Sequence, residues 1–535
     1  MRKNTFVQGA LILTIAGIIV KFIGAGSRIY LSRLLGGEGI GLYQMAYPIY
    51  LLCLAVSSAG LPVAISIMVA EKNAVHDYLG GQRVFRISMS VLTATGLFFS
   101  LLLYFGAGWL IDVGYITDPR AYWSLRALAP AIFAATILAT LRGYFQGLQS
   151  MTPTAISQIV EQLFRVVIMI GLAVMLLGYG LEYGAAGATF GAAPGAFAGI
   201  LVLLWFYYKN RTWRKEMRAS QDASIVPDST WKIVKRLLVL AVPVSLANIM
   251  LPIVSNIDLA IVPKRLIVAG FSVEESTELF GYLTGMATAL VNMPTIMTAS
   301  LAASLVPVIS EAVARANRDV IYKRTALAMR MANIITVPSF VGMCVIATPI
   351  SAMLYAIPDA GPCIAVMSLG VFLLGVQQVT TGVLQGMGKT AIPFINMVVS
   401  AGVKIILSWN LTALPSWGVL GAAWATNADF GVAAALNLYF LHKYMGYRME
   451  WGHTIRCFLS AGAMGIAVYA VYMGAYPVLH SNTLATLLAI LAGMAVYAAA
   501  IVLTGTVKAD DVAGVPKIGP KLAAAIRKID VFHKR

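Results

Sequence analysis

Long hydrophobic runs follow one another along this chain from Leu11 to Leu503, and short polar segments separate them. Most of these runs have the roughly 20 residues that an α-helix needs to cross a bilayer core, which predicts an all-α integral membrane protein of about 14 transmembrane helices. The expected spans are 10–31, 42–67, 84–106, 121–141, 154–177, 185–208, 234–257, 280–306, 325–348, 361–383, 392–412, 418–441, 456–476 and 482–504.

The composition supports this interpretation and excludes a large soluble enzyme. Of the 535 residues, 59% are hydrophobic and only 11% are charged, whereas soluble domains carry about 25% charged residues. The four cysteines are far apart and lack metal-ligand spacing, so they are expected to be buried hydrophobic side chains. The sequence has neither a Walker loop nor an HExxH motif. We therefore expect no cofactor and no enzymatic reaction.

Charge is distributed unevenly over the polar segments. Basic residues concentrate at 209–236, 315–330, 443–456 and 508–535. The alternate segments carry chiefly acids, namely Glu38, Asp112, Asp118, Glu182, Glu274, Glu275, Glu278 and Asp359. By the positive-inside rule this pattern places both termini in the cytoplasm. It also accounts for most of the net charge of +17, so nucleic acid is not an expected partner.

Two segments recur with nearly constant spacing, which indicates an internal repeat. Gly143–Gly147 (GYFQG) parallels Gly382–Gly386 (GVLQG), and Arg165 then falls opposite Lys404. We expect both Gln-Gly motifs to form tight turns between spans. The domains expected from the repeat are a first lobe at 1–208, a linker at 209–233, a second lobe at 234–441, an extra helix pair at 442–504 and a basic tail at 505–535. Parallel repeats of this kind place a substrate site between the lobes.

Several charged residues lie inside the predicted spans, where a charge costs at least about 2.5–3.5 kcal/mol and so marks a pathway. Glu161 and Arg165 have the i,i+4 spacing of an ion pair, which is either structural or part of a gate. Lys404 has Ser400 in place of that carboxylate, which makes Lys404 a candidate for a cavity. These charges indicate transport.

Asp258 and Asp429 are candidates for coupling or gating, because a desolvated carboxylate has a raised pKa and can exchange a proton. The alternative is a structural role, in which they pair with Lys264, Arg265 or Lys404. If these carboxylates have the coupling role, transport would be coupled to the membrane potential, a monovalent cation or a proton. In the first span, Gly17, Gly24 and Gly26 are expected to allow close packing or bending.

The chain resembles a known family at several motifs. They are Gly36–Gln44 (GGEGIGLYQ), Gly60–Ser66 (GLPVAIS), Glu161–Arg165 (EQLFR) and Leu305–Glu311 (LVPVISE). Together they resemble the stage V sporulation protein B-like family. This family lies in the polysaccharide-biosynthesis branch of the multidrug/oligosaccharidyl-lipid/polysaccharide (MOP) flippase superfamily, which also contains the lipid II flippases.

The resemblance implies two six-helix lobes around a central cavity, alternating access, and residence in the bacterial cytoplasmic membrane. It implies a lipid-linked oligosaccharide as cargo, namely the peptidoglycan precursor lipid II, with the cell wall or the spore cortex as destination. The extra helix pair at 442–504 would form a groove for the polyprenyl tail. Membrane lipids are the other expected partners, and we expect a monomer.

A pyrophosphate cannot cross hydrocarbon unpaired, so such a carrier needs cations in a hydrated cavity. Arg28 lies where the family's cavity arginine is expected, and Lys21 lies two turns before it on the same helix face. Snorkelling to the membrane interface is the alternative for Arg28. With Arg165 and Lys404, these residues form the candidate substrate site. The alternatives for the whole protein are a cation-coupled multidrug exporter of the same superfamily and, from another class, a membrane glycosyltransferase.

Overall fold

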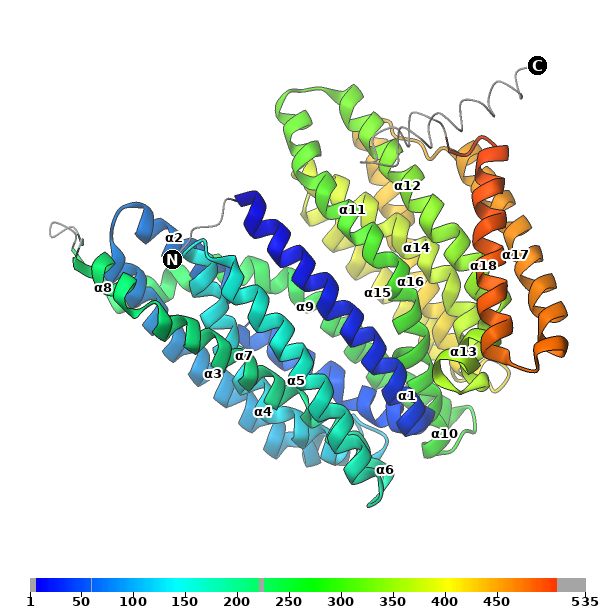
Figure 1. Ribbon diagram of the computed structural model, residues 1–535, viewed down its shortest axis with the longest axis horizontal. Helices are drawn as coiled ribbons and strands as arrows, with labels where there is room; N and C mark the ends of the chain where they lie inside the picture. The colour runs from blue at the N-terminus through cyan, green and yellow to red at the C-terminus, as the bar shows by residue number, and fades with distance from the viewer. Residues whose placement is uncertain (1–5, 59, 220, 222–225, 508–535) are drawn as a thin grey trace. The chain divides into compact units, whose positions relative to one another are not determined.

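The computed structural model describes residues 6–58, 60–219, 221 and 226–507, and within these ranges the regular structure is entirely helical (Figure 1). Twelve helical runs of this described part are long and apolar enough to cross a membrane. This confirms the predicted all-α membrane fold. The predicted basic tail at 505–535 lies almost entirely outside the described residues.

The helices form two compact units. The first unit comprises residues 1–264 and 272–281, and the second comprises 265–271 and 282–535. The helices of the first unit are α1 (Phe6–Ser58), α2 (Leu61–Ala74), α3 (Tyr78–Asp112), η1 (Pro119–Ala121), α4 (Tyr122–Gly147), α5 (Met151–Leu177), α6 (Leu181–Phe190), α7 (Ala192–Lys209), α8 (Arg211–Ala219), most of α9 (Thr230–Val268) and α10 (Val273–Phe280).

Apart from residues 265–271, the second unit lies after Gly281. Its elements are most of the π-helix η2 (Gly281–Ala287), α11 (Thr288–Ala314), α12 (Arg318–Val345), α13 (Ala347–Tyr355), η3 (Pro358–Ala360), α14 (Gly361–Gly386), α15 (Ala391–Leu411), α16 (Gly418–Met445), α17 (Trp451–Leu479) and α18 (Asn482–Leu503). Most of α9 groups with the first unit, although the repeat assigns 234–257 to the second lobe. The lobe boundaries expected from the repeat stay a prediction.

The first apolar run is long enough for two crossings. Ile12–Ala74 has 63 residues, about 95 Å of helix at 1.5 Å per residue, or three times the thickness of the bilayer core. The chain bends within α1 at Gly36, whose φ of 70° and ψ of −175° lie outside the helical region. Glycine adopts this positive φ without strain. The predicted pair of spans at 10–31 and 42–67 is consistent with this bend.

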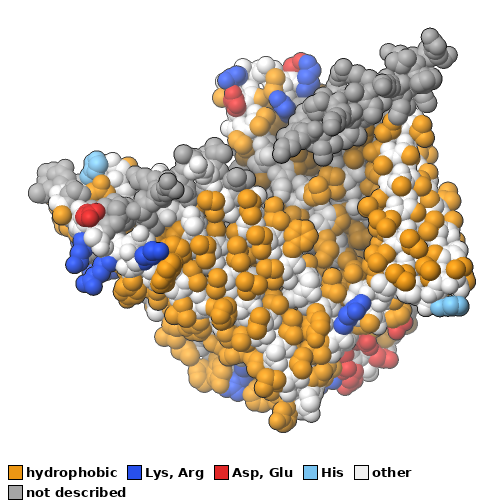
Figure 2. All heavy atoms as spheres, viewed as in Figure 1, with side chains coloured by type: hydrophobic (Ala, Val, Ile, Leu, Met, Phe, Trp, Pro, Cys, Tyr) orange, Lys and Arg blue, Asp and Glu red, His pale blue; other side chains and the backbone are white. Residues whose placement is uncertain are grey.

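The outer faces of the helices suit a lipid environment. Large apolar side chains stand exposed along them, including Phe22 at 76%, Phe105 at 75% and Ile466 at 74%. On the face shown in Figure 2, hydrophobic side chains cover the flanks of the helices. Exposed apolar surface of this extent marks contact with a membrane or a partner.

The repeat reappears in the packing of the glycines. A Cβ added to Gly143 on α4 would lie 2.7 Å from the carbonyl oxygen of Pro62 on α2. In the second unit, a Cβ added to Gly382 on α14 would lie 2.6 Å from the carbonyl oxygen of Ala302 on α11. The prediction of tight turns was therefore wrong, because the Gln-Gly motifs lie in the last turns of α4 and α14. Their glycines let two helices approach closely.

Ion pairs and a hydrogen bond connect the segment between α8 and α9 to α2, to α3 and to the turn between them. The Lys72 Nζ atom lies 2.9 Å from Asp77 Oδ2 and 2.7 Å from Asp228 Oδ2. Lys232 Nζ lies 2.6 Å from Asp228 Oδ1, and the Gln221 side chain accepts from the Leu79 amide at 2.9 Å. Hydrogen bonds from Lys232 and Lys72 lower the pKa of Asp228 to about 2.

Asp228→Asn is expected to loosen this segment at neutral pH. Because the pKa of Asp228 is lowered from its ordinary value of 3.8 to about 2, its stabilising effect is present above about pH 4 and is lost as the pH falls toward 2. Exposed ion pairs contribute up to about 1 kcal/mol, so limited proteolysis of the segment should accelerate about two- to fivefold. Asp359→Asn, at an exposed position of the short helix η3, is the control. Equal cleavage rates for both variants would contradict the expectation.

Candidate functional site

In the first unit, one carboxylate is held between two arginines from different helices. Arg165 Nη2 lies 2.8 Å from Glu161 Oε1, one turn earlier on α5. Arg142 Nη2, from α4, lies 2.8 Å from Glu161 Oε2, and Arg142 Nε donates to the Ser157 hydroxyl at 3.0 Å. The three charged side chains are 16–25% exposed. The predicted Glu161–Arg165 pair is thus present, and Arg142 completes it.

A row of tyrosines on α1 continues this cluster. Tyr43, Tyr47 and Tyr50 follow one another at helical spacing; the Tyr43 and Tyr47 rings stack with their centroids 5.6 Å apart, and the Tyr47 and Tyr50 centroids are 5.8 Å apart. Arg28, before the bend at Gly36, interacts with Tyr43, after it. Arg165 interacts electrostatically with Tyr50 and Tyr47. The row therefore extends from Arg28 to Arg165.

Lys21 precedes Arg28 by two turns on α1 and is exposed. Close to it, α1 packs against α5, since a Cβ added to Gly24 would lie 3.3 Å from Gln162 Nε2. Three helices supply the cluster, namely α1, α4 and α5, and they contact one another; α7 packs against α4 and α5 (Figure 1). The predicted first-unit cations therefore lie on adjoining helices.

The cluster has more positive than negative charge. Arg142 and Arg165 share a single carboxylate, Glu161, and Arg28 adds a third positive charge beside Tyr43 of the tyrosine row. The Nε atom of Arg165 is buried and lacks a hydrogen-bond partner among the described residues. A guanidinium binds carboxylate or phosphate oxygens through two parallel hydrogen bonds, so this cluster has the chemistry of an anion site.

The second unit has a related but more deeply buried cluster. Lys404 on α15 is 2% exposed and Asp429 on α16 is 7% exposed. The Ser400 hydroxyl, one turn before Lys404, donates to Asp429 Oδ1 at 2.5 Å. The carboxylate near this cation thus comes from the neighbouring helix.

The functional roles of Lys404, Asp429 and Asp258 stay predictions. The burial of Lys404 beside the Ser400–Asp429 pair is compatible with the structural alternative considered from the sequence. Asp258 is half-buried on α9. Two residues before it, Asn256 Nδ2 donates to the Pro48 carbonyl oxygen on α1 at 2.8 Å.

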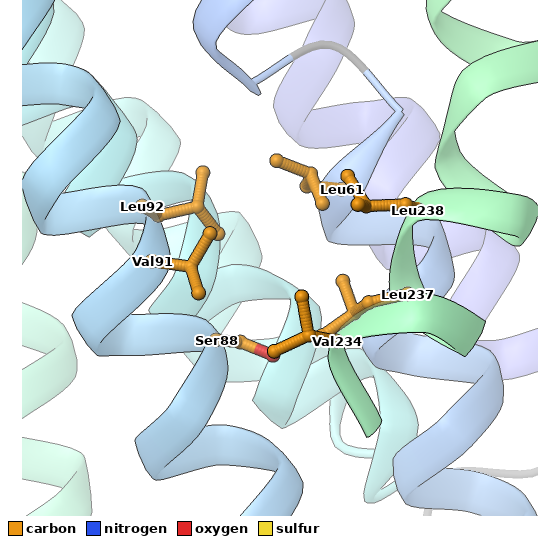
Figure 3. Close-up of a pocket in the computed structure, with 7 residues that line it drawn as sticks. All are labelled: Leu61, Ser88, Val91, Leu92, Val234, Leu237 and Leu238. Atoms are coloured by element: carbon orange, nitrogen blue, oxygen red, sulfur yellow. The ribbon is translucent and has the colours of Figure 1, made fainter. Parts of the chain in front are cut away.

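A small pocket lies elsewhere in the first unit, between α2, α3 and α9 (Figure 3). Its lining residues are Leu61, Ser88, Val91, Leu92, Val234, Leu237 and Leu238. The space that a water-sized sphere can occupy is about 10 Å³, which is no more than one water molecule requires. This pocket is too small and too apolar for a sugar or a phosphate.

Sequence reasoning missed Arg142 and the tyrosine row. Arg142 follows the predicted span 121–141 directly, whereas α4 continues to Gly147. The tyrosines at 43, 47 and 50 do have a helical period. That period by itself is more typical of packing than of a site.

Comparison with known proteins shows which family the chain belongs to. The sequence model of a family described as polysaccharide biosynthesis protein matches residues 6–313, which is more than half of the chain. The chain belongs to this polysaccharide biosynthesis protein family. A second model, MatE, matches residues 276–410. The resemblance seen in the sequence is thereby confirmed.

Among the relatives of this polysaccharide biosynthesis protein is stage V sporulation protein B of Bacillus subtilis (strain 168), which is 32% identical over 79% of this chain and 81% of the relative. Lipid II flippase MurJ of the same organism is 25% identical over 88% of this chain and 89% of its own.

Two solved structures share the fold. A MurJ structure in an inward closed conformation covers 92% of this chain and 98% of that chain, with a TM-score of 0.67 and 16% identity. An inward-facing MATE-family multidrug transporter has a TM-score of 0.67 and 16% identity, with 82% of this chain and 98% of that chain covered. The chain therefore shares the multi-pass membrane fold of these two transporters.

Proposed function

We propose that this protein is a flippase that moves an undecaprenyl-pyrophosphate-linked sugar, lipid II, across the cytoplasmic membrane by alternating access. The observation that carries the proposal is the excess of arginine over carboxylate in the membrane-spanning part of the first unit, at Arg28, Arg142 and Arg165. A lipid-linked diphosphate can leave its tail in the bilayer. Its charges, however, need cations along the way, because unpaired transfer into hydrocarbon costs many kcal/mol.

In this proposal each part of the cargo has a matching part of the protein. Arg28, Arg142 and Arg165 contact the diphosphate, with Lys21 and Lys404 as further cations. The polyprenyl tail lies along α17 and α18. Asp258 and Asp429 couple the cycle to a monovalent cation, a proton or the membrane potential. The relatives named for lipid II transport and for sporulation support this cargo and leave its destination to the vegetative wall or the spore cortex.

A multidrug exporter is the second candidate, because the fold is equally similar to a MATE-family transporter. Cationic drugs are bound best by acidic and aromatic side chains. The positive charge of the cluster in the first unit is unfavourable for them. A diphosphate is therefore the better match.

The test is a leaflet assay in cells that have no redundant flippase. Depletion of the protein should leave labelled lipid II inaccessible to an externally added probe, and re-expression should restore its accessibility. Unchanged accessibility after depletion would contradict the proposal. Uptake of a cationic dye, measured in the same cells, should not respond to depletion; a response would favour the drug exporter.

A further inference from the structure

The half-buried carboxylate of Glu161 divides its two oxygens between two arginines. One oxygen contacts Arg165 at 2.8 Å and the other contacts Arg142 at 2.8 Å. Neither arginine is held by a bidentate pair, and the buried Arg165 Nε lacks a partner among the described residues. Both guanidinium groups therefore keep hydrogen-bonding capacity that one carboxylate does not use.

The positive charges of Arg142 and Arg165 explain why the carboxylate of Glu161 lies between them. Two arginines in a low-dielectric site need an anion whenever the cargo is absent, because an unpaired buried charge is strongly unfavourable. A diphosphate carries more negative charge and more acceptor oxygens than Glu161. It can form the parallel bonds that a single bridging carboxylate leaves unmade.

We propose that Glu161 is a resident counter-ion that the cargo's diphosphate displaces from Arg142 and Arg165. This rests on the proposed function. Because Glu161 is fixed on α5 one turn from Arg165, it returns to both arginines as the diphosphate leaves. The carboxylate thus limits how tightly the cargo is held and promotes its release.

In the described part of the second unit, other residues stand at the places of Glu161 and Arg142. At the place of Glu161 it has Ser400, and at the place of Arg142 it has Thr381, whose hydroxyl accepts from Asn437 at 3.0 Å. Its carboxylate, Asp429, is 7% exposed and bonded to Ser400. Loss of Asp429 is therefore a matched control, since it removes a buried carboxylate beside one cation where no pair of arginines is present.

The experiment measures thermal unfolding of the purified full-length protein in detergent, with and without inorganic pyrophosphate. Glu161→Gln should melt below the wild type in the absence of the anion. Pyrophosphate should stabilise this variant at a concentration at least about tenfold lower than the wild type requires, because its competitor is gone. Sodium chloride of equal ionic strength should not reproduce the effect. Asp429→Asn should also melt early, but pyrophosphate should stabilise it no better than the wild type.

Two results would overturn the proposal. One is an unchanged concentration dependence in Glu161→Gln; the other is an equal gain in Asp429→Asn or with chloride, which would show a general salt effect. If Glu161→Gln does not fold, Glu161→Asp replaces it, since the shorter chain cannot span both arginines. It should then require an intermediate pyrophosphate concentration.

The same variants separate this inference from the proposed function. Glu161→Gln should transport the lipid-linked sugar more slowly than the wild type despite binding pyrophosphate more tightly. Normal transport by Glu161→Gln, with wild-type pyrophosphate affinity, would reject only the counter-ion role. Tight pyrophosphate binding by a protein whose depletion leaves lipid II accessibility unchanged would reject the proposed cargo and keep the exchange.

Discussion

Replacement of Arg165 by alanine is expected to reduce transport of the lipid-linked sugar about ten- to a hundredfold, while the protein still folds and inserts. A hydrogen bond from a charged donor contributes about 1.5–3 kcal/mol, which corresponds to that range at about 1.4 kcal/mol per tenfold. Folding should persist because Glu161 keeps its contact with Arg142 at 2.8 Å. The measurement is the leaflet assay, normalised to the amount of membrane-inserted protein.

Two further variants define the cause of the loss. Arg165→Lys keeps the charge without the planar fork, so its transport should lie between that of the wild type and that of Arg165→Ala. Arg126→Ala is the matched control, since Arg126 is also a partly buried arginine of the first unit. Its guanidinium lies 4.0 Å over the Tyr104 ring and donates to the Tyr122 hydroxyl at 2.7 Å. Equal losses from Arg126→Ala and Arg165→Ala would refute a specific role for Arg165.

The transmembrane helices could be predicted because their signal is local. Hydrophobic length by itself identifies a membrane helix, and each predicted span falls on a helix of the structure, some of them across a short break such as that between α6 and α7. The bend at Gly36 was not predicted, because a positive φ leaves no hydrophobic signal. The grouping of α9 up to Lys264 with the first unit depends on tertiary contacts, which no single stretch of sequence records.

In the candidate site too, contacts within one helix could be predicted from the sequence, whereas contacts between helices could not. Glu161 and Arg165 could be paired from the sequence because they share one face of one helix. Arg142 could not, because its contact with Glu161 depends on how α4 and α5 align. For Lys404 the sequence showed only that Ser400 takes the place of a carboxylate four residues earlier. The nearby carboxylate, Asp429, comes from α16 and bonds to Ser400, one turn before Lys404.

Of the three glycines for which close packing or bending was predicted in the first span, only Gly24 is closely packed. A Cβ added to Gly17 or Gly26 would meet no heavy atom within 4 Å, and only Gly24 has a close neighbour. The tight approach lies further along α1, at Gly41, where an added Cβ would lie 2.0 Å from the carbonyl oxygen of Thr277 on α10. A spacing of small residues in the sequence therefore did not identify the packed face.

Gly41→Ala is accordingly expected to destabilise the protein by about 3 kcal/mol, the upper part of the range for overpacked sites. The clash is with backbone, so α10 must move away from α1. This movement would break the buried hydrogen bond of 2.8 Å from the Thr277 hydroxyl to Asp118 Oδ2. Thermal unfolding of the purified variant in detergent measures the effect.

Gly26→Ala is the control on the same helix, because the added methyl group meets open space. Alanine is favoured over glycine within a helix by roughly 0.5–1 kcal/mol, so this variant should melt at or slightly above the wild-type temperature. A Gly41→Ala variant that melts together with Gly26→Ala would show that α10 does not pack on α1 at Gly41. The close contact at Thr277 would then not be a feature of the folded protein.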